Sequence, residues 1–285
     1  MSAPAASGAS AGGAMAASPG LVPYETSDTP EDKTRFCIDP VESRYTRMKR
    51  GTITSARLHQ EAVAAIRARF KTAMLTLTYR PGVDWKPHHI SDLIKCIREH
   101  CRRSGILFRG VWVAELQKRG AVHFHLLFWL PYGVTLPKPD KRGWWPHGMT
   151  QWMWIRKPLR YVTKYVSKGS GDLHFPKGLR LYGAMGLGKE QKMQRRWWML
   201  PGYIRSRFTD WREDVTRAAK GFVVRSTGEH VNSLYKFVGM EFGRAWIRLN
   251  PDVAWFDYFN ANPSELAALV LNSMQPHLRG AAIIP

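Results

Sequence analysis

Residues 115–130 read ELQKRGAVHFHLLFWL, and this stretch decides the fold of the middle of the chain. Apolar residues occupy every second position from Val122 to Leu130, which is typical of a β-strand with one buried face. The same period places His123 and His125 side by side on the opposite face, about 7 Å apart along the strand. The stretch therefore predicts a strand whose apolar face packs on helices and whose other face presents two imidazoles.

A tight hairpin precedes this strand. Residues 118–120 fit a three-residue loop, in which the last residue adopts a left-handed conformation and is usually glycine. Such a loop pairs Gln117 with Ala121, so Glu115 pairs with His123 and lies on the same face as the imidazoles. A two-residue loop would turn that carboxylate to the apolar face, where it would need a partner.

The segments around the hairpin predict an α+β domain. Lys71–Tyr79 and Phe108–Leu116 predict strands, because both are short and rich in aliphatic residues. Ile90–Arg103 and Leu159–Lys168 predict helices, and five residues of the first helix share an apolar face: Ile90, Leu93, Ile94, Ile97 and Cys101. The order strand, helix, strand, strand, helix predicts a central antiparallel sheet with helices packed on it.

The remaining segments complete the predicted organisation. Residues 1–35 are rich in Ala, Gly, Ser and Pro, and predict a disordered tail. Residues 36–200 predict the folded domain, with a further helix at Ala56–Arg69 behind a basic run that contacts phosphates or solvent. Residues 201–285 have no predicted role, and their clearest element is a helix at Pro263–Met274.

Positive charge dominates the composition of the 285-residue chain. Lys and Arg number 43 against 22 acidic residues, a net charge of +21, which favours a polyanionic partner such as nucleic acid. No stretch approaches the ~20 apolar residues that span a bilayer, and the first residues lack the features of a secretory signal. The three cysteines form no even framework. Together these features predict a cytoplasmic protein that does not bind membranes.

One carboxylate and two neutral imidazoles form a donor set for a divalent cation. Glu115, His123 and His125 suit Mg²⁺ or Mn²⁺ with open positions for phosphate oxygens, and they suit Zn²⁺ on ligand type alone. The alternative is that both histidines are half-exposed strand residues without a ligand role.

The predicted helix that follows contains YVTKYVSK. Tyr161 and Tyr165 share a face one turn apart, and Lys164 and Lys168 repeat this spacing on an adjoining strip. A phenol with a pKa of about 10 is a poor nucleophile, so an enzyme that uses it needs nearby cations and a polarised electrophile. Lys164 is close enough in sequence to stabilise either phenolate. The alternative is an ordinary helix with core tyrosines and a solvated basic face.

Three motifs in order resemble the HUH endonucleases, the rolling-circle replication initiators of single-stranded DNA phages with plasmid and viral relatives. They are LTLTY (Leu75–Tyr79), ELQKRGAVHFH (Glu115–His125) and YVTKYVSK (Tyr161–Lys168). The HFH triplet is similar to the His-hydrophobic-His motif that names the family. The two tyrosines with Lys164 between them are similar to the catalytic motif of phage initiators. The resemblance spans residues 71–168 and implies an RRM-like or palm-like architecture.

The resemblance implies a metal-dependent nickase and strand transferase that acts at one site on one strand. A metal at Glu115, His123 and His125 would polarise the scissile phosphate of single-stranded origin DNA, and Tyr161 or Tyr165 would attack it in line. The products would be a 5′-phosphotyrosine and a free 3′-OH that primes a host polymerase. Rejoining would need no ATP, because the phosphotyrosine retains a phosphodiester. A separate host helicase would unwind the duplex.

Aromatic and basic residues interleave in two clusters, and such clusters are typical of single-strand binding. Bases stack on tryptophan while arginine binds phosphates, although tryptophans of this kind can instead belong to the core. The predicted DNA contacts are Lys168, Arg142, Trp144, Trp145, Arg195, Arg196, Trp197 and Trp198.

Gly183–Lys189 matches GxxxxGK, the first seven positions of a phosphate-binding loop. Glu190 stands where Ser or Thr should bind Mg²⁺, so the segment predicts a flexible glycine-rich connection and not an ATP site.

Two other functions remain open at the level of sequence. A transposase or relaxase with the same chemistry is the nearest enzymatic alternative. A non-catalytic, basic single-stranded DNA-binding or regulatory protein would explain the charge and the Trp/Arg clusters. It would leave the carboxylate, the two histidines and the two tyrosines without a role.

Overall fold

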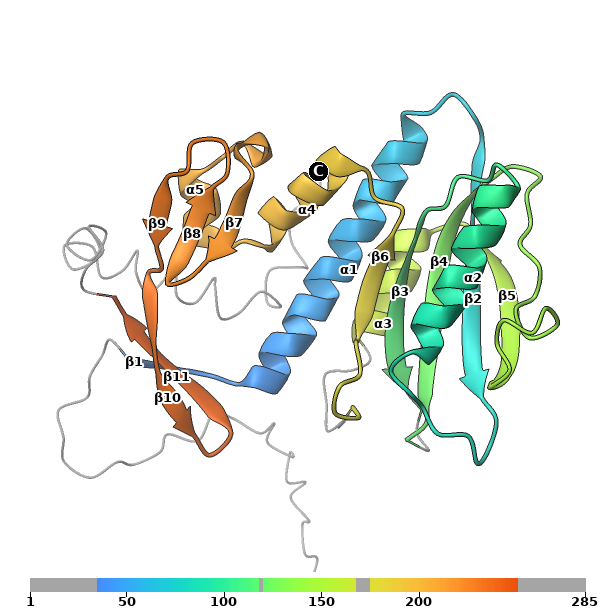
Figure 1. Ribbon diagram of the computed structural model, residues 1–285, viewed down its shortest axis with the longest axis horizontal. Coiled ribbons are helices and arrows are strands. Elements are labelled where there is room, and N and C mark those ends of the chain that lie inside the picture. The colour runs from blue at the N-terminus through green and yellow to red at the C-terminus, as the bar shows by residue number, and fades with distance from the viewer. Residues whose placement is uncertain (1–34, 118–119, 168–174, 251–285) are drawn as a thin grey trace, which may run out of the picture. The chain divides into compact units, whose positions relative to one another are not determined.

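The computed structural model describes residues 35–117, 120–167 and 175–250, and it has an α+β fold built on antiparallel sheets (Figure 1). The central sheet has five strands in the order β5-β2-β4-β3-β6. They are β2 (Phe70–Tyr79), β3 (Gly110–Leu116), β4 (Val122–Pro131), β5 (Gly148–Ile155) and β6 (Tyr182–Met185). All neighbouring strands of this sheet are antiparallel. The predicted fold class is confirmed, and the arrangement is compatible with an HUH-type fold.

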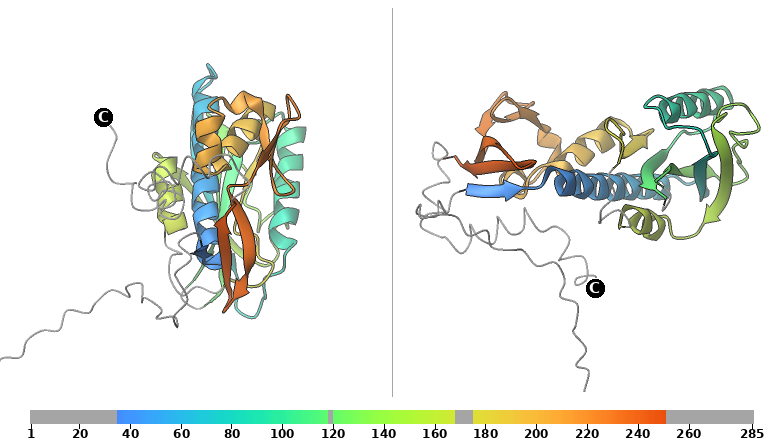
Figure 2. Two further views of the ribbon diagram at one scale, coloured as in Figure 1. Left: turned by 90° about the vertical axis from the view of Figure 1, so that its left-hand side faces the viewer. Right: turned by 90° about the horizontal axis from the view of Figure 1, so that it is seen from below.

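Helices cover both faces of the central sheet (Figure 2). Helix α2 (His89–Arg103) covers one face, where the Tyr79 hydroxyl lies 3.0 Å from Nδ1 of His89. Helices α1 (Pro40–Ala64) and α3 (Pro158–Ser167) cover the other face, where Trp129 Nε1 donates to Gln60 of α1 at 3.1 Å. We call these two surfaces the α2 face and the α1/α3 face. No helix in the described ranges combines the length and the apolar character that a membrane span requires.

The alternation of β4 assigns its residues to the two faces as predicted. Phe124, Leu126 and Phe128 lie on the α2 face and are fully buried. Leu127 and Trp129 on the α1/α3 face are buried as well. The sequence predicted helices on the apolar face alone, and the structure adds α1 and α3 on the other.

Helix α1 begins at Pro40, well before the predicted start at Ala56. Asp39 caps it, because its Oδ1 accepts hydrogen bonds from the backbone N–H of Val41 at 2.7 Å and of Glu42 at 3.1 Å. The first half of the helix buries small and polar residues such as Gly51, whose pattern does not resemble an apolar stripe. Two buried hydroxyls are satisfied within the helix, from Thr52 to the Met48 carbonyl and from Ser55 to the Gly51 carbonyl.

Helix α2 follows the predicted pattern closely. Its buried face includes all five residues expected there: Ile90, Leu93, Ile94, Ile97 and Cys101. The last turn carries His100, Arg102 and Arg103, whose positive charges are favourable near the partial negative charge of a helix C-terminus.

The later part of the described chain forms a second apolar cluster. It contains helices α4 (Lys189–Met199) and α5 (Gly202–Arg207) and a 3₁₀ turn (Trp211–Glu213). One sheet has the order β7-β8-β9 and the other β1-β11-β10. Their strands are β1 (Arg35–Ile38), β7 (Val215–Ala218), β8 (Gly221–Val224), β9 (His230–Asn232), β10 (Tyr235–Glu241) and β11 (Arg244–Leu249). The cluster includes Leu200, Tyr203, Ile204, Phe208 and Phe222. The predicted tail up to residue 34 and the predicted helix at Pro263–Met274 lie outside the described residues.

The GxxxxGK segment is a strand, a turn and a helix start, so the prediction of a flexible connection is wrong. Gly183 lies in β6, where a Cβ atom would approach Nε1 of Trp112 to 2.4 Å. Gly186 has a φ of +72°, and Gly188 caps the N-terminus of α4. The first glycine of the motif therefore serves close packing and not phosphate binding.

Candidate active site

The hairpin between β3 and β4 places Glu115 directly opposite His123. The backbone N–H of Gln117 donates to the Ala121 carbonyl at 2.9 Å, and that of Gly120 donates to the Gln117 carbonyl at 2.8 Å. Gly120 has a φ of +80°, as the predicted loop type requires. The predicted pairing is confirmed, although loop residues 118–119 themselves lie outside the described part of the chain.

Glu115 and His125 contact each other on the α1/α3 face. Oε2 of Glu115 lies 2.6 Å from Nε2 of His125, and their side chains are 17% and 5% exposed. The other ring nitrogen of His125, Nδ1, lies 3.2 Å from the hydroxyl of Thr76 on β2. A hydroxyl can donate or accept, so Thr76 holds the ring in either neutral tautomer. Nε2 can therefore donate its proton to Glu115 or present a lone pair to a cation.

His123 completes the polar end of this face. Its ring centroid lies 6.2 Å from that of His125, and it stands one position nearer the hairpin on the same face of the strand. Across the sheet, His123 pairs with Thr78 of β2, and Thr78 pairs with Met149 of β5. A row from Glu115 to Met149 thus crosses four strands at one end of the sheet.

Helix α3 brings a tyrosine onto this cluster. The ring of Tyr165 stacks on the imidazole of His125, with centroids 3.8 Å apart and planes at 21°. Tyr161 lies one turn earlier, and its hydroxyl donates to Sδ of Met153 at 4.0 Å. Lys164 is exposed between them. Lys168 lies outside the described residues, so its predicted DNA contact has no structural description.

The donor set fits a divalent cation in its chemistry. It consists of one carboxylate and two imidazoles, and two donors that share a small cation lie about 3 Å apart, close to the Glu115–His125 contact. The three side chains do not converge on one point: in residues 35–117, 120–167 and 175–250 no group of three His, Cys, Asp or Glu is placed to hold a metal ion. Two of the predicted ligands are therefore in contact, and the third would have to turn toward them.

The first predicted Trp/Arg cluster divides between the surface and the core. Arg142 is exposed, and its guanidinium lies 5.8 Å from the ring of the half-buried Trp144. Trp145 is only 1% exposed and packs against Tyr79 with centroids 5.1 Å apart. The prediction that Trp145 stacks on a base is wrong, because its indole belongs to the core.

The second cluster lies on α4 and is largely engaged within the protein. Arg196 forms an ion pair with Asp214, and Trp197 donates from Nε1 to the Phe208 carbonyl at 2.6 Å. These contacts tie both side chains to the second apolar cluster, which leaves them poorly placed for the predicted DNA contacts. Trp198 carries the guanidinium of Arg57 at 4.5 Å from its ring centroid.

Sequence reasoning missed the contribution of β2 and β5 to the site. Thr76 supports His125, and the signal was the alternation of threonine with leucine in LTLTY, which places Thr76 and Thr78 on the polar face. Strand β5 was not predicted, although it carries Met149 and Met153 beside the cluster. Its sequence GMTQWMWI does not alternate between apolar and polar residues.

Residues 72–170 match the model of a family described as replication-associated protein ORF2. The matched segment begins in β2 and ends just beyond α3, so it contains every residue of the cluster described above. Neither the comparison with curated proteins nor the comparison with solved structures gave a match. The family match is consistent with a protein that takes part in DNA replication and interacts with DNA.

Proposed function

We propose that this protein initiates rolling-circle replication as a metal-dependent, site- and strand-specific nickase and strand transferase. The observation that carries the proposal is the cluster of Tyr165 on His125 and of His125 on Glu115, inside the segment that matches a replication-associated family. A buried acid–imidazole pair against a tyrosine ring, at the edge of a strongly basic protein, suits phosphoryl transfer from DNA to a phenol.

Glu115, His123 and His125 would hold Mg²⁺ or Mn²⁺, and Thr76 would keep the His125 ring in the tautomer that presents Nε2. The cation, when bound, supplies Lewis-acid polarisation of the scissile phosphate. The Glu115 carboxylate also fixes the ring of His125 by their direct contact, so it has a positioning role even before the cation binds.

The nucleophile would be the phenolic oxygen of Tyr161 or Tyr165. This oxygen forms a bond to phosphorus and the bond from phosphorus to the 3′ oxygen breaks. The phenol loses its proton to solvent and the departing 3′ oxygen takes one up. Lys164 would stabilise the phenolate and the charge on the phosphate. Attack by a 3′-OH on the phosphotyrosine reverses these steps and rejoins the strand.

Two tyrosines with different neighbours would serve two successive cleavages. Tyr165 lies on His125, and Tyr161 lies one turn away beside Met153. One phenol can hold the first 5′ end while the other attacks the regenerated origin. The free 3′-OH would be extended by a host polymerase, with unwinding by a separate host helicase, in a cytoplasmic setting.

The test is covalent capture of single-stranded DNA. Purified protein is incubated with labelled origin DNA of its own replicon, with Mn²⁺ or with EDTA, and adducts are resolved on denaturing gels. Tyr161→Phe, Tyr165→Phe and the double variant are compared with wild type. Tyr132→Phe is the matched control, because Tyr132 is 56% exposed and lies outside α3. We expect a metal-dependent adduct that survives in the control and disappears in the double variant.

The proposal fails if the protein binds the origin strand tightly but forms no adduct with any divalent cation. That outcome supports a non-catalytic single-stranded DNA-binding protein, which the charge of +21 would also explain. Loss of the adduct in one single variant alone would identify one working nucleophile and reject the alternating pair.

A further inference from the structure

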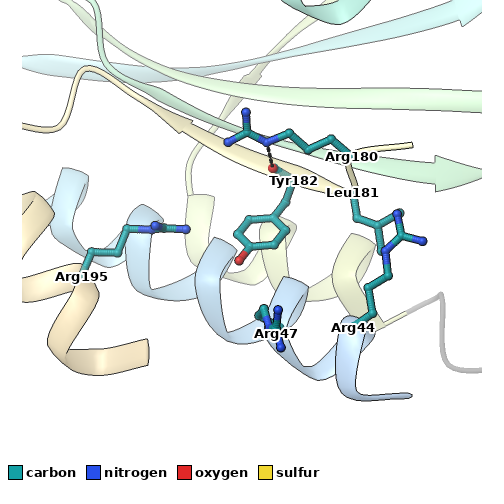
Figure 3. A pocket seen from close by; sticks show the side chains of 6 residues that line it. All are labelled: Arg44, Arg47, Arg180, Leu181, Tyr182 and Arg195. Atoms are coloured by element: carbon teal, nitrogen blue, oxygen red, sulfur yellow. Dashed lines mark hydrogen bonds between the residues drawn. The ribbon is translucent and has the colours of Figure 1, made fainter. Parts of the chain in front are cut away.

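A pocket of about 360 Å³ opens between α1, β6 and α4, apart from the tyrosine cluster (Figure 3). Four arginines, one leucine and one tyrosine line it: Arg44, Arg47, Arg180, Leu181, Tyr182 and Arg195. Its walls come from three segments far apart in the sequence, which the fold of the central sheet brings together.

The positive charges of this pocket are not neutralised within the described chain. Salt bridges between side chains there involve none of its four arginines. Arg44 donates to the Leu179 carbonyl, Arg180 Nε to the Tyr182 carbonyl at 3.0 Å, and Arg195 Nε to the Ser55 hydroxyl at 2.7 Å. Each guanidinium has five N–H donors, so these contacts fix its orientation and leave donors for a ligand.

The ring of Tyr182 forms a fixed wall of the pocket. It packs directly on Gly51 of α1, where a Cβ atom would come within 2.5 Å of the ring. The guanidinium of Arg195 lies 5.8 Å from the ring centroid on the α4 side (Figure 3). Oriented guanidinium groups around a rigid aromatic wall match a phosphate group, whose oxygens accept paired N–H bonds.

The pocket lies on the same face of the sheet as the tyrosine cluster. Tyr182 pairs with Val113 of β3, and Leu181 accepts a hydrogen bond from Ala114 N at 2.7 Å. Tyr182 is therefore one strand and two residues from Glu115, a separation of about 8 Å between Cα atoms. A few nucleotides of extended strand would span this separation.

We propose that the arginine pocket binds a backbone phosphate of the DNA strand that is being cut, and so sets the position of that strand relative to the tyrosines. The inference rests on the proposed function for the identity of the ligand. Phosphate contacts position a strand without reading its sequence, which matches a pocket without base-reading side chains such as Asn or Gln. Free inorganic phosphate has the same chemistry and is distinguished below.

The variant Arg47→Gln/Arg180→Gln tests the proposal, because both residues are exposed and neither contacts the tyrosine cluster. The matched control, Arg67→Gln/Arg98→Gln, removes two exposed arginines elsewhere on the protein. Binding of a fluorescent single-stranded oligonucleotide is measured by anisotropy in EDTA over a range of salt concentrations. We expect binding at least about tenfold weaker for the pocket variant. We also expect the slope of log K against log salt to fall by about 0.7 for each phosphate released.

Equal effects of the pocket variant and the control on affinity and slope would overturn the proposal. Calorimetry with inorganic phosphate provides the second arm. Loss of phosphate binding in the pocket variant, with oligonucleotide binding equal to the control, would assign the pocket to free phosphate and also overturn it. Circular dichroism melting confirms that both double variants are folded.

Failure of this inference is separable from failure of the proposed function, since the binding assay contains EDTA and needs no cleavage. Pocket-dependent binding without any covalent adduct would uphold the pocket and reject the nickase. An adduct whose yield and DNA affinity do not depend on the pocket would do the reverse.

Discussion

The α2 face and the α1/α3 face of the central sheet are made by the same strands but differ in composition. The α2 face presents buried apolar side chains from three strands, among them Leu75, Leu77, Phe124 and Leu126. At the hairpin end, the α1/α3 face presents Glu115, His123, His125 and two threonines. Successive residues of β4 thus serve packing on one side and chemistry on the other.

The comparison shows how one strand can specify a fold and hold reactive groups at once. Residues that point to α2 can be chosen for volume alone, since no polar atom is needed there. Residues that point to α1 and α3 must satisfy their polar atoms with each other, as Glu115, His125 and Thr76 do. The stability of the domain and the reactivity of the site should therefore respond to different substitutions.

The largest effect on stability is expected on the α2 face. Phe124→Ala removes a fully buried ring that packs on Tyr79 and Trp112, so we expect the free energy of unfolding to fall by about 3–5 kcal/mol. Urea denaturation followed by circular dichroism measures the change. A loss below about 1 kcal/mol would contradict the assignment of this face to the core.

The matching substitution on the α1/α3 face should change activity with little change in stability. Glu115→Gln keeps an acceptor for Nε2 of His125 but removes the negative charge. We expect adduct formation to slow by about a hundredfold, equivalent to about 2.7 kcal/mol in the barrier. Initial rates of adduct formation with Mn²⁺ measure this, and a rate within twofold of wild type would show that the carboxylate has no role in the reaction.

Close packing on the α2 face extends to β6. Gly183→Ala would push a Cβ atom against the indole of Trp112, so we expect a loss of about 2 kcal/mol in unfolding free energy. Gly239→Ala is the control, since a Cβ atom there meets no atom within 4 Å, and its effect should stay within about 0.5 kcal/mol. Equal stabilities of the two variants would mean that Gly183 does not pack as described.

The smallest expected effect concerns His59, which packs from α1 on Trp129. Burial lowers the pKa of His59 to about 4, and the charge of Arg109 lowers it further. The unfolded chain, with a pKa of about 6.5, binds a proton at pH 5.5 that the folded protein does not, so acidification destabilises the fold. We expect this residue to contribute about 1 kcal/mol of lost stability between pH 7.5 and 5.5.

The variant His59→Gln isolates this contribution, because glutamine keeps a donor for the Gly110 carbonyl that His59 Nε2 contacts at 3.1 Å. Urea denaturation of both proteins at the two pH values gives the comparison. The variant should lose about 1 kcal/mol less than wild type on acidification. Parallel losses would show that His59 does not titrate differently on folding.

The sequence predicted those parts of the fold in which local periodicity and burial agree. Strand β4, the three-residue hairpin and the apolar stripe of α2 follow directly from spacing, because each has one buried face. The first half of α1 was missed, since it buries glycine and hydroxyl side chains against β6, a pattern that no apolar stripe announces. Strand β6 was missed because a glycine in it serves to admit the ring of Trp112.

The candidate site shows the same division. The pairing of Glu115 with His123 followed from the loop length, and the shared face of the tyrosines followed from helical spacing. The stacking of Tyr165 on His125 depends on how α3 docks against the sheet, which no local pattern encodes. The burial of Trp145 likewise depends on its tertiary neighbours, Tyr79 and Phe124.

The most direct test of the central claim is to identify the residue that becomes attached to DNA. Wild-type protein is reacted with origin single strand and Mn²⁺, digested with protease and nuclease, and analysed by mass spectrometry. The account predicts a nucleotide on the peptide that contains Tyr161 and Tyr165, with either tyrosine carrying the 5′ phosphate. A nucleotide on any residue outside α3, or none on any peptide despite cleavage of the strand, would contradict it.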